Sequence, residues 1–455
     1  MAFRSPTGTQ DLLPAAARQW QVLQDRAAQV FSLYGYQPVE TPTFEYLDVF
    51  ARGIGEATDV VGKEMFRVLS ANRLAELATG AETRSALTEE LGSAASAGDA
   101  ENADSLALRP EMTAGVVRAV VQANLLPAGA SALKLYYAGS MFRYERPQKG
   151  RLREFHQIGA ECLGAAEPSA DVELIEMMMR YLTELGLPAE RLVLKLNSMG
   201  DDQCRPAYRQ MVREFILAQP ELCPDCQRRA HTNPLRAFDC KNSHCQDILA
   251  AAPRITESLC PDCSEHYARV KSLLSAEGIA FAEDHRLVRG LDYYTRTVFE
   301  VQVTSGLGSQ NAIGGGGRYD KLVAEFGGNP TPGLGFALGF ERIALVLNAC
   351  AGNWAALTTP LVYVAAVDDS CRADAWQLAR VLRQGGLATE LDHQRRSLRS
   401  QFKVADKSGA RYVVIVGPDE LASGQAKLRD MTSSREIVVP IVELPGVIAA
   451  NQTVQ

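Results

Sequence analysis

The segment MFRYERPQKGRLREFHQIGAECLG, residues 141–164, decides the fold that we predict. An apolar run at residues 133–137 precedes it, and residues 154–162 form a second strand-like run. The loop between them, residues 146–153, is polar and contains proline and glycine. Two such runs joined by a turn-forming loop are typical of an antiparallel β-hairpin. We therefore expect an antiparallel sheet here.

Basic side chains gather around this predicted hairpin, at Arg143, Arg146, Lys149, Arg151 and Arg153. Each guanidinium offers a planar fork of donors at fixed charge, which suits a polyphosphate. A solvated basic turn explains the charge pattern equally well. Gln157 and Glu161 follow on the second strand, and because their spacing is even, both side chains lie on the same face of the sheet.

Two further segments carry residues of chemical interest. LVRGLDYYTRTVFE (residues 287–300) has Arg289, Tyr293 and Tyr294 close together, although adjacent tyrosines are more often packing neighbours than a ligand site. PGLGFALGFERIALVL (residues 332–347) reads as a glycine-rich strand that turns into a helix, and its glycines permit close approach of the backbone. It fits neither the dinucleotide-binding nor the P-loop spacing.

Composition excludes several classes of protein. The chain has 455 residues, 46% of them hydrophobic, and a net charge of −7, which argues against a non-specific nucleic-acid binder. The N-terminus has no apolar run of a secretory signal. The uncharged stretch at residues 343–367 is interrupted by Asn348, Gly352, Asn353 and Pro360, so we do not expect it to span a membrane. We expect a soluble, cytoplasmic protein.

The pattern along the chain predicts two domains. Residues 1–355 alternate helical and strand patterns, with a low-complexity insertion at 71–105 and a helical, cysteine-bearing insertion at about 201–280. A β-α-β-α-β alternation follows Pro360 and predicts a second, α/β domain over residues 360–455. The fold class is thus an α+β domain built on an antiparallel sheet, with a C-terminal α/β domain.

These segments resemble the histidyl-tRNA synthetases, which are class II aminoacyl-tRNA synthetases. The hairpin is similar to motif 2 of that class, residues 287–300 to the histidine-specific loop and residues 332–347 to motif 3. Four other segments agree: TGTQDLLP (7–14), YGYQPVETPTFE (34–45, similar to motif 1), LRPEMTAG (108–115) and GGGGRYDKLV (314–323). The tail QFKVADKSGARYVVIVG (401–417) resembles the family's anticodon-binding domain.

The resemblance implies a role for individual residues. Arg143 and Arg289 would act in catalysis at the α-phosphate of ATP. Histidine would be bound by Glu111, Thr113, Gln157, Glu161, Tyr293 and Tyr294. ATP would be bound by Arg143, Glu145, Phe155 and Arg342.

The resemblance also implies the reaction and the partners. Such an enzyme forms histidyl-adenylate from histidine and ATP, accompanied by Mg²⁺, and transfers histidine to the 3′ end of tRNA(His). A homodimer is implied through the segment similar to motif 1. The alternative is a synthetase-like regulatory subunit of histidine biosynthesis, which binds histidine. Such paralogues typically lose the anticodon-binding domain and the catalytic arginines, whereas both are present here.

Six cysteines gather between residues 223 and 263. Two CxxC pairs, Cys223 with Cys226 and Cys260 with Cys263, predict a structural zinc site, because each turn presents two thiolates at one point. The family resemblance lends this no support, and a set of ordinary reduced thiols is the alternative.

A second basic cluster lies in the tail. Arg395, Arg399, Lys403 and Lys407 follow one another at i, i+4 spacing and therefore share one helix face. A solvated helix face is the plain interpretation. Within an anticodon-binding domain we favour contact with RNA phosphates. The predicted tRNA-binding residues are Arg151, Arg153, Arg399, Lys403 and Lys407.

Overall fold

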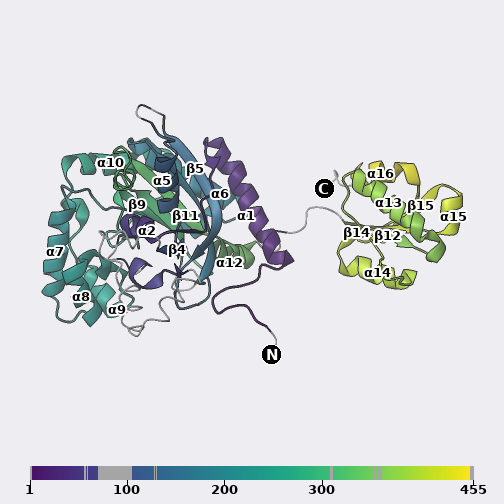
Figure 1. The fold of residues 1–455 in the computed structure, drawn as a ribbon, viewed down its shortest axis with the longest axis horizontal. Helices are drawn as coiled ribbons and strands as arrows, with labels where there is room; N and C mark the ends of the chain where they lie inside the picture. Colours follow the sequence, from purple (N-terminus) through teal and green to yellow (C-terminus); the bar gives the residue numbers. More distant parts are fainter. Residues whose placement is uncertain are drawn as a thin grey trace. The chain divides into compact units, whose positions relative to one another are not determined.

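A computed structural model of the chain describes residues 3–55, 58, 60–69, 105–127, 129, 131–307, 311–351, 354–355 and 361–450. Apart from Ser105, the predicted insertion at 71–105 lies outside these residues. The chain divides into two units, Met1–Ala355 and Ala356–Gln455 (Figure 1).

An eight-stranded sheet forms the centre of the first unit. Its central strands pair antiparallel, and only the outermost pairs, β1 with β5 and β7 with β8, are parallel. In spatial order the strands are β1 (Gln37–Pro38), β5 (Leu133–Phe142), β6 (Glu154–Leu163), β11 (Gly333–Gly339), β10 (Ala312–Arg318), β9 (Thr295–Val303), β7 (Leu192–Ser198) and β8 (Phe281–Glu283). The predicted α+β fold on an antiparallel sheet is confirmed.

The β5–β6 hairpin contains most of the segment 141–164, for which a hairpin was predicted. In its register Leu135 faces Glu161, and Gly139 faces Gln157. On its other side β6 pairs with β11, so that Glu161 faces Gly335. The motif-2-like and motif-3-like segments are thus neighbouring strands.

One face of this sheet is covered by helices. α1 (Pro14–Leu33), α6 (Pro168–Glu184) and α12 (Phe340–Cys350) pack there, where Phe31, Tyr181 and Phe336 are almost fully buried. The buried residues of α1 recur at three- and four-residue spacing, which is the pattern of an amphipathic helix. Even-numbered residues of β6 face this core, so Gln157 and Glu161 face the opposite side.

The opposite face is only partly covered, and α5 (Thr113–Gln122) packs on it. A small antiparallel sheet leads the chain to this helix, with strands β2 (Phe44–Tyr46), β4 (Leu106–Leu108) and β3 (Arg67–Val68). Helices α2 (Leu47–Ile54) and η1 (Val60–Glu64) lie between β2 and β3 in the sequence. This arrangement places the N-terminus of α5 over β6.

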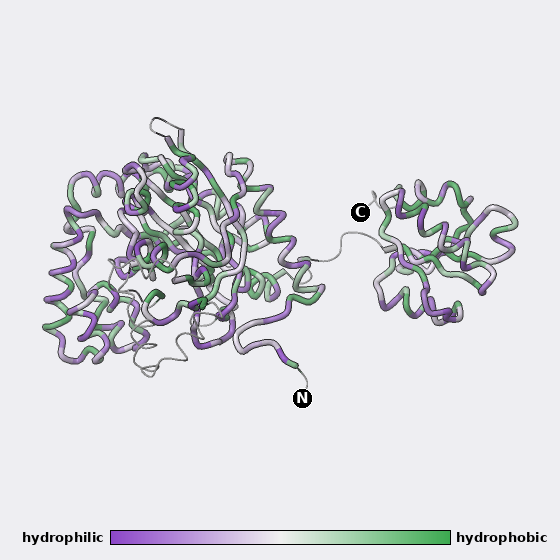
Figure 2. The backbone as a smooth tube through the Cα atoms, viewed as in Figure 1, coloured by the Kyte–Doolittle hydropathy of each residue, from purple (hydrophilic) through white to green (hydrophobic). Residues whose placement is uncertain are grey.

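The cysteine-bearing segment forms a helical insertion with its own apolar core, which includes Val212, Phe238 and Leu249. Its elements are α7 (Arg205–Leu217), α8 (Pro224–Thr232), η4 (Pro234–Asp239), α9 (Ser243–Leu249), η5 (Ile255–Glu257) and α10 (Pro261–Ala276). In Figure 1, α7, α8 and α9 lie beside the sheet, and Figure 2 shows hydrophilic residues along their outer side.

The second unit is a five-stranded sheet in the order β13-β12-β14-β15-β16. β12 (Leu361–Ala366), β13 (Thr389–Leu391) and β14 (Ala410–Val416) are parallel and are connected by α13 (Arg372–Gln384) and α14 (Leu398–Lys407), as the alternation predicts. β15 (Gln425–Asp430) and β16 (Glu436–Pro440) add an antiparallel extension that the sequence analysis did not identify. α13 packs on one face of the sheet and α14 on the other. Short helices α15 (Pro418–Ala422) and α16 (Leu444–Ala450) complete the unit.

Within the described part of the chain, no helix combines the length and apolar character needed to cross a bilayer.

Candidate active site

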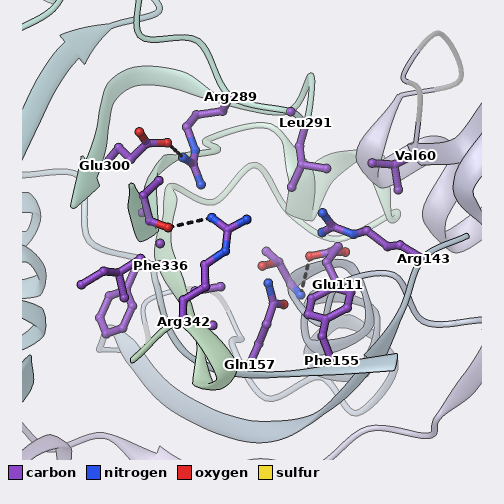
Figure 3. A pocket seen from close by; sticks show the side chains of 18 of the residues that line it. Val60, Glu111, Arg143, Phe155, Gln157, Arg289, Leu291, Glu300, Phe336 and Arg342 are labelled. Atoms are coloured by element: carbon purple, nitrogen blue, oxygen red, sulfur yellow. Dashed lines mark hydrogen bonds and ion pairs between the residues drawn. The ribbon is translucent and has the colours of Figure 1, made fainter. Parts of the chain in front are cut away.

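A cavity opens on the uncovered face of the large sheet. It is lined by residues of β6, β10 and β11, by the loop that contains Arg289–Gly290–Leu291, and by the residues just before α5. Figure 3 shows Arg289 and Arg342 on one side of this space and Arg143 on the other, all three pointing into it, with Gln157 and Phe155 below. Three segments that lie far apart in the sequence therefore meet at one site.

Glu161 lies directly behind residues that line the cavity, and it is only 1% exposed. Its Oε1 accepts hydrogen bonds from Thr113 Oγ1 (2.6 Å) and from the hydroxyl of Tyr137 (3.2 Å). Its Oε2 accepts one from the hydroxyl of Tyr319. Burial raises the pKa of Glu161 to about 8, although these hydrogen bonds act in the opposite direction.

Glu111 is a second buried carboxyl group at this site. It accepts hydrogen bonds from the backbone N–H groups of Thr113 (2.7 Å) and Ala114 (3.0 Å) and so caps the N-terminus of α5. Burial raises its pKa, while those two N–H groups lower it. Beside it, the Oε1 atom of Gln157 is buried and accepts no hydrogen bond from any described residue. A buried acceptor without a donor suggests a site for a ligand that donates.

Tyr293 and Tyr294 line the same end of the cavity. Their ring centroids lie 4.6 Å apart, and the Tyr293 ring meets that of Tyr319 edge-on at 5.5 Å. The carbonyl of Tyr294 accepts a hydrogen bond from Arg205, the first residue of α7. The two tyrosines are therefore fixed by packing and by the helical insertion together.

The three arginines are held by neutral or anionic partners. Arg143 Nε donates to the carbonyl of Pro110 (2.9 Å), and its guanidinium lies 5.3 Å from the centre of the Phe155 ring. Arg342 donates to the carbonyl of Ala312 (2.6 Å).

Arg289 forms an ion pair with Glu300 of β9 (2.8 Å), while its own Nε is buried and donates to no described residue. Burial alone would lower the pKa of Arg289, but Tyr294 and Glu300 outweigh it, so the pKa is raised.

Arginines that line the cavity lie close enough to repel one another, although glutamates line it as well. Burial lowers the pKa of Arg143, and repulsion by Arg289 adds to that effect. The same two causes act on Arg342, which is repelled by Arg143, Arg151 and Arg289. Guanidinium groups remain charged at neutral pH despite such shifts, so a polyanion that enters the cavity relieves their mutual repulsion. Such a group of arginines suits a polyphosphate.

Two residues of the hairpin loop, Arg151 and Arg153, have partners within the chain. Arg151 pairs with Glu145, with a hydrogen bond of 2.7 Å from its guanidinium to Oε1. Arg153 stacks on the ring of Tyr144 at 3.9 Å and donates to the carbonyl of Glu145 (3.3 Å). Contact of Arg151 and Arg153 with tRNA stays a prediction. Contact of Glu145 with adenine also stays a prediction, and in this structure Glu145 is paired with Arg151.

Models of two protein families match the chain. The histidyl-tRNA synthetase model matches residues 8–88, 74–202 and 223–343, and the anticodon-binding-domain model matches residues 361–451. The chain belongs to the histidyl-tRNA synthetase family. The resemblance seen in the sequence is confirmed.

Full-length relatives in this family agree. The histidine–tRNA ligase of Anaeromyxobacter dehalogenans is 44% identical over 98% of this chain and 99% of its own. That of Desulforamulus reducens is 43% identical over 99% of this chain and its whole length. The crystal structure of apo S. aureus histidyl-tRNA synthetase superposes with a TM-score of 0.76 at 30% identity, over 98% of this chain and 99% of that one.

Within this synthetase fold, the structure adds site residues that the sequence analysis missed. Tyr137 and Tyr319 hold Glu161, and Glu300 holds Arg289. Tyr319 belongs to the segment GGGGRYDKLV, which was noted only as a family resemblance. No spacing rule identifies these partners, since they come from three separate strands or loops and meet only in the folded sheet.

The cysteines form two groups, each with four potential metal ligands. Cys223 and Cys226 lie with Cys240 and Cys245, whereas Cys260 and Cys263 lie with Cys204 and Asp201. The prediction that Cys223, Cys226, Cys260 and Cys263 share one site is therefore wrong. The two CxxC turns begin different helices, α8 and α10, and each turn faces a different part of the insertion.

Three of the four basic residues predicted to share one helix face, Arg399, Lys403 and Lys407, lie on α14. The prediction is wrong for Arg395, which precedes the helix and has a φ of +52°. Arg399, Lys403 and Lys407 are all exposed. α14 packs on the sheet of the second unit through Leu398, Phe402 and Ala405, so its basic residues point outward. Contact of this face with tRNA stays a prediction.

Proposed function

We propose that this protein is a histidine–tRNA ligase that activates histidine with ATP and transfers it to the 3′ end of tRNA(His). One observation carries the proposal. The buried carboxyl group of Glu161, surrounded by three hydroxyl groups, adjoins a cavity into which three arginines point (Figure 3). The first feature suits a small polar side chain, and the second suits a polyphosphate.

The imidazole of histidine enters at the end of the cavity lined by Tyr293 and Tyr294, toward the buried Glu161 behind them. Its two ring nitrogens require hydrogen-bonding partners, which an apolar slot does not offer. A site built from such partners rejects analogues that lack them by up to about 10⁴- to 10⁵-fold. Glu111 and the unpaired Oε1 of Gln157 provide acceptors for the α-ammonium group, and Thr113 lies beside them.

ATP occupies the arginine-lined part of the cavity. Arg143 and Arg289 hold the α-phosphate, and Arg342 holds the γ-phosphate end. Phe155 provides a flat surface for adenine, and Glu145 contacts the base once Arg151 releases it. Magnesium enters with ATP as part of that substrate.

In the first step, a carboxylate oxygen of histidine attacks the α-phosphorus of ATP. The bond from that phosphorus to the bridging oxygen breaks, and its electron pair leaves with pyrophosphate. Negative charge grows on the α-phosphate oxygens in the transition state, and Arg289 is held in place beforehand by Glu300. A preorganised positive charge stabilises that state without reorganisation.

In the second step, the 3′-hydroxyl of tRNA attacks the carbonyl carbon of the adenylate, loses its proton and displaces AMP. The C-terminal unit binds the anticodon region of tRNA, through the exposed basic face of α14 among its contacts. Such an enzyme works in the cytoplasm, where its tRNA substrate is charged.

A homodimer completes the proposal. Phe44, inside the motif-1-like segment, and Tyr46, just after it, both lie in β2 and are 53% and 52% exposed in the single chain. Two large apolar side chains exposed on one short strand favour a protein partner. Light scattering with size-exclusion chromatography measures the mass, and a mass of one chain at micromolar concentration contradicts the dimer.

The regulatory-subunit alternative is tested by tRNA charging. The purified protein is incubated with ATP, labelled histidine and a tRNA(His) transcript, and labelled tRNA is counted. The proposal predicts charging of tRNA(His) and not of a tRNA for another amino acid. A folded sample that binds histidine but charges no tRNA supports the regulatory subunit. The presence of Arg143, Arg289 and Arg342 in the cavity favours an enzyme over a regulatory subunit.

A further inference from the structure

We propose that the helical insertion binds two zinc ions in separate tetrahedral sites. Site A consists of Cys223, Cys226, Cys240 and Cys245. Site B consists of Asp201, Cys204, Cys260 and Cys263. In each set, one potential ligand atom per residue lies within 4.8 Å of all the others.

The geometry of site A matches a single ion. A zinc–sulfur bond of about 2.3 Å in a tetrahedron places neighbouring sulfurs about 3.8 Å apart. The Sγ atoms of Cys223 and Cys240 are 3.8 Å apart. A disulfide requires about 2.05 Å, and all ten cysteines are free. The sulfurs therefore stand at the spacing of ligands around a shared cation.

The backbone around site A supports thiolate ligands. Cys223 precedes the first turn of α8, and Cys226 lies within that turn, where the helix dipole favours negative charge. The N–H of Cys223 donates to Sγ of Cys245 (3.3 Å). Hydrogen bonds of this kind orient a metal-binding sulfur and stabilise its charge.

Site B repeats this construction with one substitution. The tetrapeptide Cys-Pro-Asp-Cys recurs at the start of α10, where Cys260 caps the helix as Cys223 caps α8. An oxygen ligand at about 2.0 Å and a sulfur ligand at about 2.3 Å stand roughly 3.5 Å apart around tetrahedral zinc. Asp201 Oδ1 lies 3.3 Å from Sγ of Cys204 and 3.7 Å from Sγ of Cys260.

The loop of site B is shaped to bring its ligands together. Gly200 has a φ of +62°, and a Cβ atom at this position would lie 2.6 Å from Sγ of Cys204. A side chain at residue 200 would therefore displace Cys204. The N–H of Asp201 also donates to that sulfur (3.2 Å), as Cys223 does to Cys245 in site A.

The ligand sets identify zinc and a structural role. Thiolates in a tetrahedral arrangement prefer Zn²⁺ over the hard cations Mg²⁺ and Ca²⁺. Four protein ligands in each site leave no open coordination position for a substrate or an activated water. Both sites therefore hold the fold together and take no part in the chemistry.

The two proposed zinc sites stabilise helices that contact the loop carrying Tyr293 and Tyr294. Cys204 of site B is followed directly by Arg205, which donates to the carbonyl of Tyr294. Site A encloses η4 between its ligand pairs, and Arg236 of η4 forms an ion pair with Asp292 (3.0 Å). The two sites thus brace the helices that anchor the loop carrying Tyr293 and Tyr294.

Metal analysis of the full-length protein tests the proposal. The chain is purified without chelators or a metal-affinity column, and zinc per chain is measured by elemental mass spectrometry. We expect two zinc ions in the native chain, one in Cys226→Ser, one in Cys263→Ser and none in the double variant. Cys350→Ser is the matched control, because Cys350 is a half-buried thiol outside both groups, and it should retain two.

Asp201→Cys keeps the proposal testable if the serine variants fail to fold. This variant should retain two metal ions. After refolding with Co²⁺, it should show stronger thiolate-to-cobalt charge-transfer absorption than the native chain, because one thiolate has replaced a carboxylate.

Zinc below half an ion per chain in folded native protein, with all thiols free to react with Ellman's reagent, overturns the proposal. Iron in place of zinc, or thiols consumed in disulfides, overturns it as well. A single zinc that Cys226→Ser removes and Cys263→Ser leaves in place overturns site B alone, and the reverse result overturns site A alone. None of these measurements depends on the enzymatic activity.

Discussion

Gly335 of β11 lies opposite Glu161 of β6, and a Cβ atom on residue 335 would stand 1.7 Å from Oε2 of Glu161. The glycine therefore makes the room in which the buried carboxyl group meets its three hydroxyl partners. Its φ is not in the left-handed region, so the reason for glycine here is space.

Gly335→Ala should displace Glu161 and impair use of histidine. A buried polar group that loses its hydrogen-bond partners costs about 1–3 kcal/mol, or roughly 5- to 150-fold in kcat/KM for histidine. The KM for ATP should change much less, since the arginines are not touched. Gly446→Ala is the control, because a Cβ there meets no atom within 4 Å. Unchanged kinetics in Gly335→Ala would show that the position of the Glu161 carboxyl group does not matter for the use of histidine.

Glu161→Gln should change stability in a pH-dependent way. The pKa of Glu161 is raised to about 8 from an ordinary value of 4.5. The folded chain therefore keeps a proton that the unfolded chain releases, and the free energy of unfolding falls as pH rises from about 4.5 through 8. The variant lacks this penalty. Its Tm minus that of the native protein should rise between pH 5 and pH 8.5, while histidine activation falls.

Thermal melts across that pH range measure the effect. Glu190→Gln removes an exposed carboxyl group instead and should leave the Tm difference flat. A flat profile in Glu161→Gln too would mean that Glu161 is not a strained buried acid.

Arg289→Ala should act on catalysis. Removal of a preorganised charge at the α-phosphate should slow adenylate formation by roughly 10² to 10³, as for loss of a transition-state donor. Histidine and ATP affinity should change far less, because Glu111 and Arg143 remain. Arg289→Lys should restore the rate only in part, since an ammonium group lacks the planar fork. Single-turnover kinetics with quenched samples measures the step.

A structural role for Arg289 makes a different prediction. The substitution leaves Glu300 without its ion pair at 2.8 Å, so a thermal melt accompanies the kinetics. A large fall in Tm with a near-native rate per folded molecule would show that Arg289 mainly stabilises β9.

Charge reversal on α14 should weaken tRNA binding alone. Lys403→Glu removes one phosphate contact, so KM for tRNA should rise, and the slope of log KM against log salt should flatten by roughly one unit. Arg380→Glu is the matched control, because Arg380 is exposed on α13, which packs on the opposite face of the same sheet. Equal effects of the two reversals would indicate a non-specific charge effect. A change in histidine adenylation would contradict the assignment of α14 to tRNA.

Many of the helices and strands were predictable because each follows from the periodicity of its own segment. The β5–β6 hairpin, α1, α6 and the turn from β11 into α12 each carry their pattern within one continuous segment. The placement of Gln157 and Glu161 on the open face follows from their even spacing alone. β15 and β16 were missed, since short exposed strands such as Glu436–Pro440 lack a clear alternation.

Partners that meet across the fold were not predictable in the same way. Tyr137 reaches Glu161 from β5 and Tyr319 from the residue after β10, so the sequence around each says nothing of the other. The cysteines show the same limit. A CxxC spacing predicts that Cys223 acts with Cys226, but which residues complete the set depends on where α8 and α10 begin in space.

Histidine-dependent exchange of labelled pyrophosphate into ATP is the decisive measurement of histidine activation, because it requires binding of histidine and reversible chemistry at the α-phosphate in one site. The full chain is assayed with each of the twenty amino acids at saturating Mg–ATP. We expect exchange with histidine and only background with the others. A folded protein that shows no exchange with histidine, or equal exchange with another amino acid, contradicts this expectation.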